Sequence, residues 1–157
     1  MRITAKVDYA VRAAIELARH YPDDGSRPVP VARHTVAKSQ DIPSKFLEHI
    51  LADLKRANIM GSARGADGGY WLQRDPGEIS VADIIRAVEG PLADVRGERP
   101  DALDYPEEMV ALQRTWIAVR ANLRAVLETV TLADLAAGNL PASIDLIADD
   151  PDAWITR

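Results

Sequence analysis

The sequence predicts a mainly α-helical protein with a small β-hairpin wing, that is, a winged helix-turn-helix domain followed by a long dimerisation helix. Two helices that could form a helix-turn-helix precede a glycine-rich hairpin, and a long heptad-like apolar pattern follows. We divide the chain into the winged helix-turn-helix domain (1–90), a loop (91–105), the dimerisation helix with a following short helix (106–138) and a C-terminal tail (139–157).

The three N-terminal helices are predicted from apolar spacing and capping residues. Thr4 suits the N-cap of the first helix, whose apolar residues recur at helical spacing up to Tyr21. A weaker pattern over residues 31–40 predicts the second helix. Pro43 suits the first position of the third, because its missing N–H would be unpaired there anyway. The apolar face of this third helix contains Phe46, Leu47, Ile50, Leu51 and Leu54.

A hairpin and a capped helix complete the first domain. Asn58 tolerates the left-handed conformation that ends the third helix. Residues 59–64 and 70–74 are strand-like, and the segment between them contains three glycines, which predicts a hairpin with a flexible tip. Ser80 and Asp83 have the spacing of a capping box, and the helix that they begin stops at Gly90.

The second half of the chain is dominated by one long helical pattern that begins near Pro106. Its apolar positions advance alternately by three and four residues, as in the a/d seam of a left-handed helix pair. This apolar seam, our predicted dimer interface, consists of Met109, Leu112, Trp116, Val119, Leu123, Val126 and Val130. The alternative is a single helix packed on its own domain. The preceding residues 92–105 lack periodicity and are predicted to form a linker or mobile loop.

Composition excludes several classes of protein. The chain has no cysteine, which excludes disulfides, thiolate nucleophiles and cysteine-ligated zinc. No apolar stretch is long enough for a membrane span and no signal sequence is evident, so we expect a cytoplasmic protein without a membrane partner. The net charge of −5 is unevenly distributed, since residues 1–64 carry 11 basic and 7 acidic side chains and the remainder is acidic. A basic first part is compatible with double-stranded DNA as partner.

Candidate DNA-binding residues lie on the helix pair and the wing. The helix that begins at Pro43 would enter the major groove with its N-terminal side chains toward base edges. These side chains are Ser44, Lys45, Glu48 and His49. The end of the preceding helix would hold backbone phosphates through Lys38, Ser39 and Gln40. Arg64 precedes the slim glycine-rich turn and is a candidate for the minor groove.

These segments together resemble the Rrf2 (Rrf-two) family of bacterial transcription regulators, which includes the iron-sulfur-cluster assembly repressor and the cysteine-metabolism repressor. The resemblance rests on QDIPSKFLEHIL (40–51), RGADGGY (64–70) and the helix after Ser80, and it covers nearly the whole chain. It implies a winged-helix domain with a dimerisation helix. It also implies that Lys45, Glu48 and His49 meet bases and that Arg64 is the wing arginine.

The sequence departs from the family pattern at two places. Asn58 replaces a customary glycine and can adopt the same cap. Cluster-binding members carry cysteines in the loop before the long helix, whereas residues 92–105 here contain none, so we expect no iron-sulfur cluster, no other cofactor and no metal. The three histidines are too scattered in the sequence to suggest replacement ligands. Control by a small molecule, by a protein partner or by no signal stays open.

The sequence therefore predicts a homodimeric, sequence-specific transcription regulator that binds a palindromic operator. Repression is favoured over activation. The alternative is a protein-interaction module that uses the winged-helix fold to bind a protein partner. We expect no enzyme, because the sequence shows no catalytic triad grouping, no phosphate-binding loop and no metal-ligand spacing. Trp116 and Trp71 are candidates for an effector pocket, although core packing is the favoured role for both.

Overall fold

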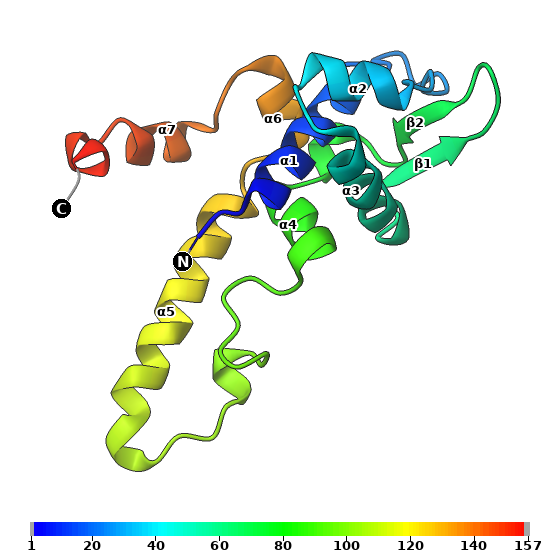
Figure 1. Cartoon of the computed structure of the whole chain (residues 1–157). Coiled ribbons are helices and arrows are strands. Elements are labelled where there is room, and N and C mark those ends of the chain that lie inside the picture. The colour runs from blue at the N-terminus through cyan, green and yellow to red at the C-terminus, as the bar shows by residue number, and fades with distance from the viewer. Residues whose placement is uncertain (1, 156–157) are drawn as a thin grey trace.

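The computed structural model describes residues 2–155 and has two parts of different shape, a helical head and a long helix, α5, that projects from it (Figure 1). The helices are α1 (Ala5–Ala18), α2 (Arg33–Ser39), α3 (Ser44–Arg56), α4 (Val81–Glu89), α5 (Val110–Leu127), α6 (Leu132–Ala137) and α7 (Ala142–Ala148). The strands are β1 (Met60–Ala63) and β2 (Gly69–Leu72), and four short 3-10 turns lie at Pro76–Glu78, Pro100–Ala102, Glu107–Met109 and Pro151–Trp154. The predicted mainly helical fold with a β-hairpin wing is confirmed. Residues 1, 156 and 157, at the ends of the predicted domain and tail, lie outside the described range.

The core of the head is aliphatic and forms around α1. Thr4 caps this helix as predicted, by accepting a hydrogen bond from the Val7 amide. Small side chains on the buried face of α1 allow α3, α4 and α6 to pack closely against it. The buried apolar residues of α1 are Val7, Ala10, Ala13, Ala14, Leu17 and Ala18. The Lys6 ammonium group of α1 also makes polar contacts with α4 and α3. It donates to the Val88 carbonyl at 2.7 Å and lies 2.8 Å from the Asp53 carboxylate.

Helix α3 contributes four large aliphatic side chains to the core. Four of the five residues on its predicted apolar face are buried, namely Leu47, Ile50, Leu51 and Leu54. The prediction for Phe46 is wrong, because its side chain is 48% exposed and packs edge-to-face on Tyr9, with ring centroids 5.9 Å apart. Phe46 lies about 100° around the helix from Leu47, which places it at the margin of the buried stripe. Pro43 is the N-cap rather than the first helical residue, and Asn58 has the predicted left-handed backbone, with φ of 56°.

The wing is a two-stranded antiparallel hairpin with one additional bridge. Met60 pairs with Leu72 and Ala63 pairs with Gly69 at the two ends of the ladder. Val31, just before α2, exchanges two backbone hydrogen bonds of 2.8 Å with Tyr70. A Cβ atom on Gly69 would lie 2.5 Å from the Val31 carbonyl oxygen, so this close approach requires glycine.

Two capping boxes join the head to the end of α5. Ser80 with Asp83 caps α4, as predicted, and Thr131 with Asp134 caps α6. The two N-caps are bridged, since the Val81 amide donates to the Val130 carbonyl at 2.9 Å. Val130 lies beyond the end of α5 and is buried within its own chain, with 6% of its surface exposed.

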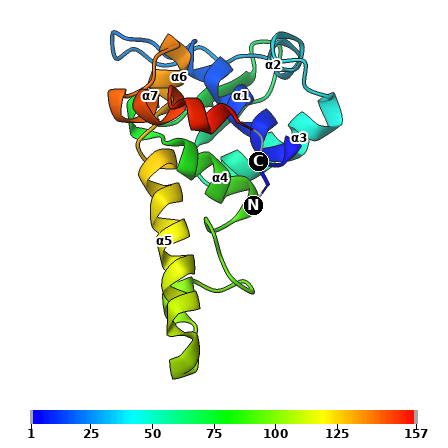
Figure 2. The ribbon, with the colours of Figure 1, turned by 90° about the vertical axis from the view of Figure 1, so that its left-hand side faces the viewer.

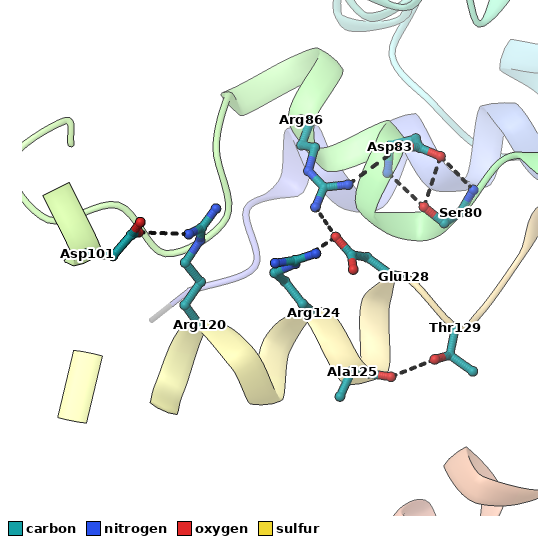
Figure 3. A network of polar contacts seen from close by, with 9 residues as sticks. All are labelled: Ser80, Asp83, Arg86, Asp101, Arg120, Arg124, Ala125, Glu128 and Thr129. Atoms are coloured by element: carbon teal, nitrogen blue, oxygen red, sulfur yellow. Dashed lines mark hydrogen bonds and ion pairs between the residues drawn. The ribbon is translucent and has the colours of Figure 1, made fainter. Parts of the chain in front are cut away.

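Helix α5 is held at its two ends but is otherwise little covered. At its C-terminal end, Glu128 accepts hydrogen bonds from Arg86 of α4 and Arg124 of α5 (Figure 3). These bonds from Arg124 and Arg86 lower the Glu128 pKa to about 2. Along the helix, the Gln113 amide donates to the Pro100 and Leu103 carbonyls at 3.0 and 2.7 Å. No residue of α5 is buried.

The loop before α5 is more structured than predicted, because Val95 and Glu98 form a backbone bridge and Leu92 and Pro100 are buried. At the other end of the chain, residues 139–155 form an arm of α7 and the last 3-10 turn, which extends away from the head in Figure 1 and lies in front of the head, toward the viewer, in Figure 2. None of the helices within residues 2–155 is both long and apolar enough to cross a membrane.

Candidate nucleic-acid interface

A tight turn sets the direction of α3 relative to α2. Asp41 adopts a positive φ of 51°, which reverses the chain after α2. Ile42 is buried and its amide donates to the Ala37 carbonyl at 2.9 Å. The apolar anchor and the hydrogen bond fix the angle between the two helices, so α3 can present its first turn at the surface.

The first turn of α3 is open to solvent and electropositive. Pro43 makes no side-chain capping bond, so the first amides of the helix lack the usual intrachain partner. Ser44 and Lys45 are exposed there, and within residues 2–155 Lys45 forms no ion pair. The helix dipole adds a partial positive charge at this end. This combination can bind a phosphate and can donate to a guanine edge.

Two further predicted side chains follow on the same surface of α3. Glu48 is exposed and lies 3.4 Å from Arg33 at the start of α2. This ion pair offsets the repulsion between Glu48 and phosphate, and Arg33 is a residue that sequence reasoning missed. The His49 Nδ1 atom lies 2.9 Å from the Lys45 carbonyl oxygen, an interaction that leaves Nε2 available for another partner.

The three predicted phosphate-binding residues at the end of α2 lie in different environments. Lys38 is exposed, and Ser39 is exposed with its hydroxyl donating to the Val36 carbonyl at 3.2 Å. Gln40 instead turns toward α1, where its side-chain amide donates to Glu16 at 2.8 Å and its backbone carbonyl accepts from Arg12. Glu16 is only 7% exposed. Gln40 therefore holds the turn on α1 in this structure.

The wing presents one cation at a glycine-rich tip. Arg64 is exposed and has no ion-pair partner among the described residues, and Gly65 has a φ of 110° that favours glycine. Lys55, near the end of α3, donates to the Ser62 hydroxyl of β1 at 2.8 Å. This bond links the wing to α3. Sequence reasoning missed it, because Lys55 and Ser62 are ordinary polar residues in separate elements.

The indole of Trp71 braces the base of the wing. It packs over Gly61, where an added Cβ would lie 2.5 Å from the ring, and the Arg27 guanidinium lies 5.9 Å from its centroid. Trp71 is partly buried. It therefore supports the hairpin and takes no part in the groove beside α5.

A separate apolar groove of about 710 Å³ lies between α5, the N-terminal segment, α4 and the loop after it. Four predicted seam residues line it, namely Trp116, Val119, Leu123 and Val126. Ile3, Ile85 and Leu92 form part of the opposite wall. Trp116 is 37% exposed, so the prediction that it packs in the core is wrong. The other seam residues, Met109 and Leu112, are 47% and 40% exposed.

Comparison with known proteins identifies the family of this fold. The Rrf2 family model, described as "Iron-dependent Transcriptional regulator", matches residues 3–138. The chain belongs to the Rrf2 family. Its members that match this chain are named as transcriptional regulators and not as enzymes.

Individual relatives cover nearly the whole chain. A Mycobacterium tuberculosis protein, provisionally named an HTH-type transcriptional regulator, is 43% identical over 150 residues, which are 96% of this chain and 90% of the relative. CymR of Bacillus subtilis is 33% identical, with 87% of this chain and 90% of the relative covered.

Solved structures show the same architecture. The structure of CymR, the global cysteine regulator of B. subtilis, has a TM-score of 0.71 at 32% identity and covers 88% of this chain and 98% of that one. The structure of T. potens IscR has a TM-score of 0.64 at 30% identity and covers 100% of this chain and 93% of that one.

The residues of this chain do not fit an iron-sulfur cluster of the usual kind. Such clusters are ligated by cysteine thiolates, and the sequence has no cysteine. Within residues 2–155, no group of three or more histidine, aspartate or glutamate side chains is arranged to hold a metal ion. The loop that would supply ligands is instead closed by its own backbone bridge and by Gln113.

Proposed function

We propose that this chain is a sequence-specific DNA-binding transcription regulator that acts as a homodimer on a palindromic operator in the cytoplasm. The observation that carries the proposal is the uncapped, exposed first turn of α3 beside a wing that ends in Arg64. A hydrogen bond from Lys55 to Ser62 links these two DNA-facing elements. Membership of the Rrf2 family supports the same function.

In the proposed complex, α3 lies in the major groove and the wing follows the adjacent minor groove. Lys45 donates to guanine, while His49 and Glu48 add base discrimination. Lys38 and Ser39 contact phosphates, and Arg64 enters the minor groove, where the potential is most negative. Gln40 acts indirectly, because its amide is already bound to Glu16.

The dimer uses the long helix. The apolar seam of α5, from Met109 to Val126, is exposed or only half-buried in the isolated subunit, which is costly unless a second copy covers it. A two-fold axis along this seam would place two α3 helices on successive major-groove faces, about 34 Å apart. We infer repression, since a dimer bound across a promoter blocks polymerase, and we infer regulation without an iron-sulfur cluster.

Footprinting and gel shifts on the intergenic region beside the gene test the proposal. We expect protection of a palindrome and affinity that falls with salt, as phosphate contacts require. Lys45→Ala should relax base preference at one position, at a cost of about 1–3 kcal/mol, whereas Arg64→Ala should weaken binding to all sequences. Arg99→Ala is the matched control, because it removes the same charge from the loop beside α5.

The outcomes separate the proposal from its alternative. Equal losses for Lys45→Ala and Arg64→Ala on operator and random DNA would contradict the assigned roles. Absence of any salt-sensitive binding above random DNA, together with capture of a stoichiometric protein partner, would instead establish a protein-interaction module.

A further inference from the structure

The C-terminal arm, residues 139–155, carries large apolar side chains that its own chain leaves uncovered. Leu146, Ile147 and Trp154 are 77%, 57% and 80% exposed, while Ile144 is buried and anchors the arm. A helix as short as α7 (Ala142–Ala148) is not stable in water by itself. The Trp154 indole donates to the Ala148 carbonyl at 2.7 Å, so the last 3-10 turn folds back onto the end of α7.

Helix α5 has a second apolar face besides the predicted seam. Val110, Ile117 and Ala121 are spaced by seven and four residues and therefore share one side of the helix. Val110 and Ile117 are 42% and 40% exposed, which matches the exposure of the seam residues Leu112 and Val119. We call this side the outer face. A single partner helix on the seam would cover only one side of α5 and would leave the outer face open.

Charge favours the arm as that occupant. The arm carries four aspartates and no basic residue, whereas α5 carries three arginines and no acidic residue. Arg120 and Arg124 are engaged by Asp101 and Glu128. Arg114, which lies beside the outer face, has no ion-pair partner among the described residues. In both views the end of the arm lies apart from the α5 of its own chain (Figures 1 and 2).

We propose that the arm of each subunit docks on the outer face of α5 in a second copy of the chain. Leu146, Ile147 and Trp154 cover Val110 and Ile117, and Asp145 or Asp149 pairs with Arg114. The exchange is reciprocal, because a two-fold axis brings each arm to the other subunit. The proposal rests on the homodimer of the proposed function and adds a second, separable contact to it.

Because the chain lacks cysteine, a pair of introduced cysteines tests the contact in the full-length protein. Ile147→Cys in one chain and Ile117→Cys in a differently tagged chain are mixed, allowed to exchange subunits and oxidised. We expect a disulfide between the two chains, identified by peptide mass spectrometry. Val119→Cys is the matched control, since Val119 has the same 40% exposure but faces the groove.

A charge exchange and an apolar substitution provide independent measurements. Arg114→Asp should weaken self-association by roughly tenfold in sedimentation equilibrium, and Asp145→Arg together with Asp149→Arg should restore it. Leu146→Ser with Trp154→Ser should have a similar effect and should leave the helical circular dichroism of the head unchanged.

The outcomes of these experiments test the arm contact and the homodimer separately. A disulfide from Ile147→Cys to Val119→Cys but not to Ile117→Cys would place the arm in the groove and overturn the proposal. A stable dimer without any arm disulfide would also overturn it and leave the homodimer intact. A chain that stays monomeric at all concentrations would reject both the arm contact and the proposed homodimer.

Discussion

The winged-helix head and α5 use the same kinds of apolar residue but cover them to different extents. Leu47, Ile50 and Leu54 of α3 are fully buried within the subunit, whereas Leu112 and Val119 of α5 are each 40% exposed. The head therefore supplies its own core. No residue of α5 is buried in its own chain, so the proposed dimer predicts that protein concentration affects the stability of α5 but not that of the head.

The parts of the chain before and after the wing arginine also differ in charge. Residues 1–64 have a net charge of +4, and residues 65–157 have a net charge of −9. The basic first part contains the exposed first turn of α3. The overall charge of −5 is thus a poor guide to the surface that would meet a phosphate backbone.

The largest expected effect comes from emptying the core of the head. Leu54 is 0% exposed, so Leu54→Ala should lower the free energy of unfolding by about 2–5 kcal/mol at every protein concentration. Leu112→Ala on α5 is the matched variant. Its cost should depend on concentration, because in the proposed dimer a second copy covers this side chain. Urea unfolding at two protein concentrations that differ a hundredfold measures both costs. The same dependence on protein concentration for the two variants would contradict the proposed difference between the head and α5.

A smaller effect is expected at the left-handed cap after α3. Asn58 has a φ of 56°, which alanine adopts at a cost of roughly 1–2 kcal/mol, whereas glycine adopts it freely. Asn58→Ala should therefore destabilise the head and Asn58→Gly should not. Thermal unfolding compares the two, and Gly138→Ala at the end of α6, with φ of 74°, repeats the test next to the arm. Equal melting temperatures for Asn58→Ala and Asn58→Gly would refute the assignment.

Local signals made the head predictable from the sequence. The caps at Thr4, Ser80 and Asn58 depend on residues within four positions, and their chemistry is specific enough to mark element ends. The inward turn of Gln40 could not be predicted, because Glu16 lies 24 residues away and the contact depends on the packing of α1. The exposure of Phe46 depends in the same way on Tyr9.

For α5, the sequence predicts the helix but not what covers its apolar side. Its heptad spacing correctly indicates a helix with an apolar side, but spacing alone does not specify whether that side faces the same chain or another one. The structure divides the seam, since Trp116 to Val126 line the groove while Val130 is buried under the N-cap of α4. This division comes from the bridge between two capping boxes, which are separated by about fifty residues in the sequence.

The smallest effect is expected at the junction between the two regions. Glu128 accepts hydrogen bonds from Arg124 and Arg86, which lower its pKa from 4.5 to about 2 (Figure 3). A depressed carboxyl pKa stabilises the folded state above the unfolded pKa of 4.5, and this contribution is lost as the pH falls toward 2. Glu128→Gln should therefore cost less than about 1 kcal/mol at pH 7, because the group is partly exposed.

The difference between wild type and Glu128→Gln should shrink between pH 5 and pH 2, which thermal unfolding across that range measures. Glu108→Gln makes the same charge change at the other end of α5, where no ion pair is present among the described residues, and serves as the control. A difference that stays constant down to pH 2 would show that Glu128 contributes nothing through its charge. In that case the capping-box bridge alone would join α5 to the head.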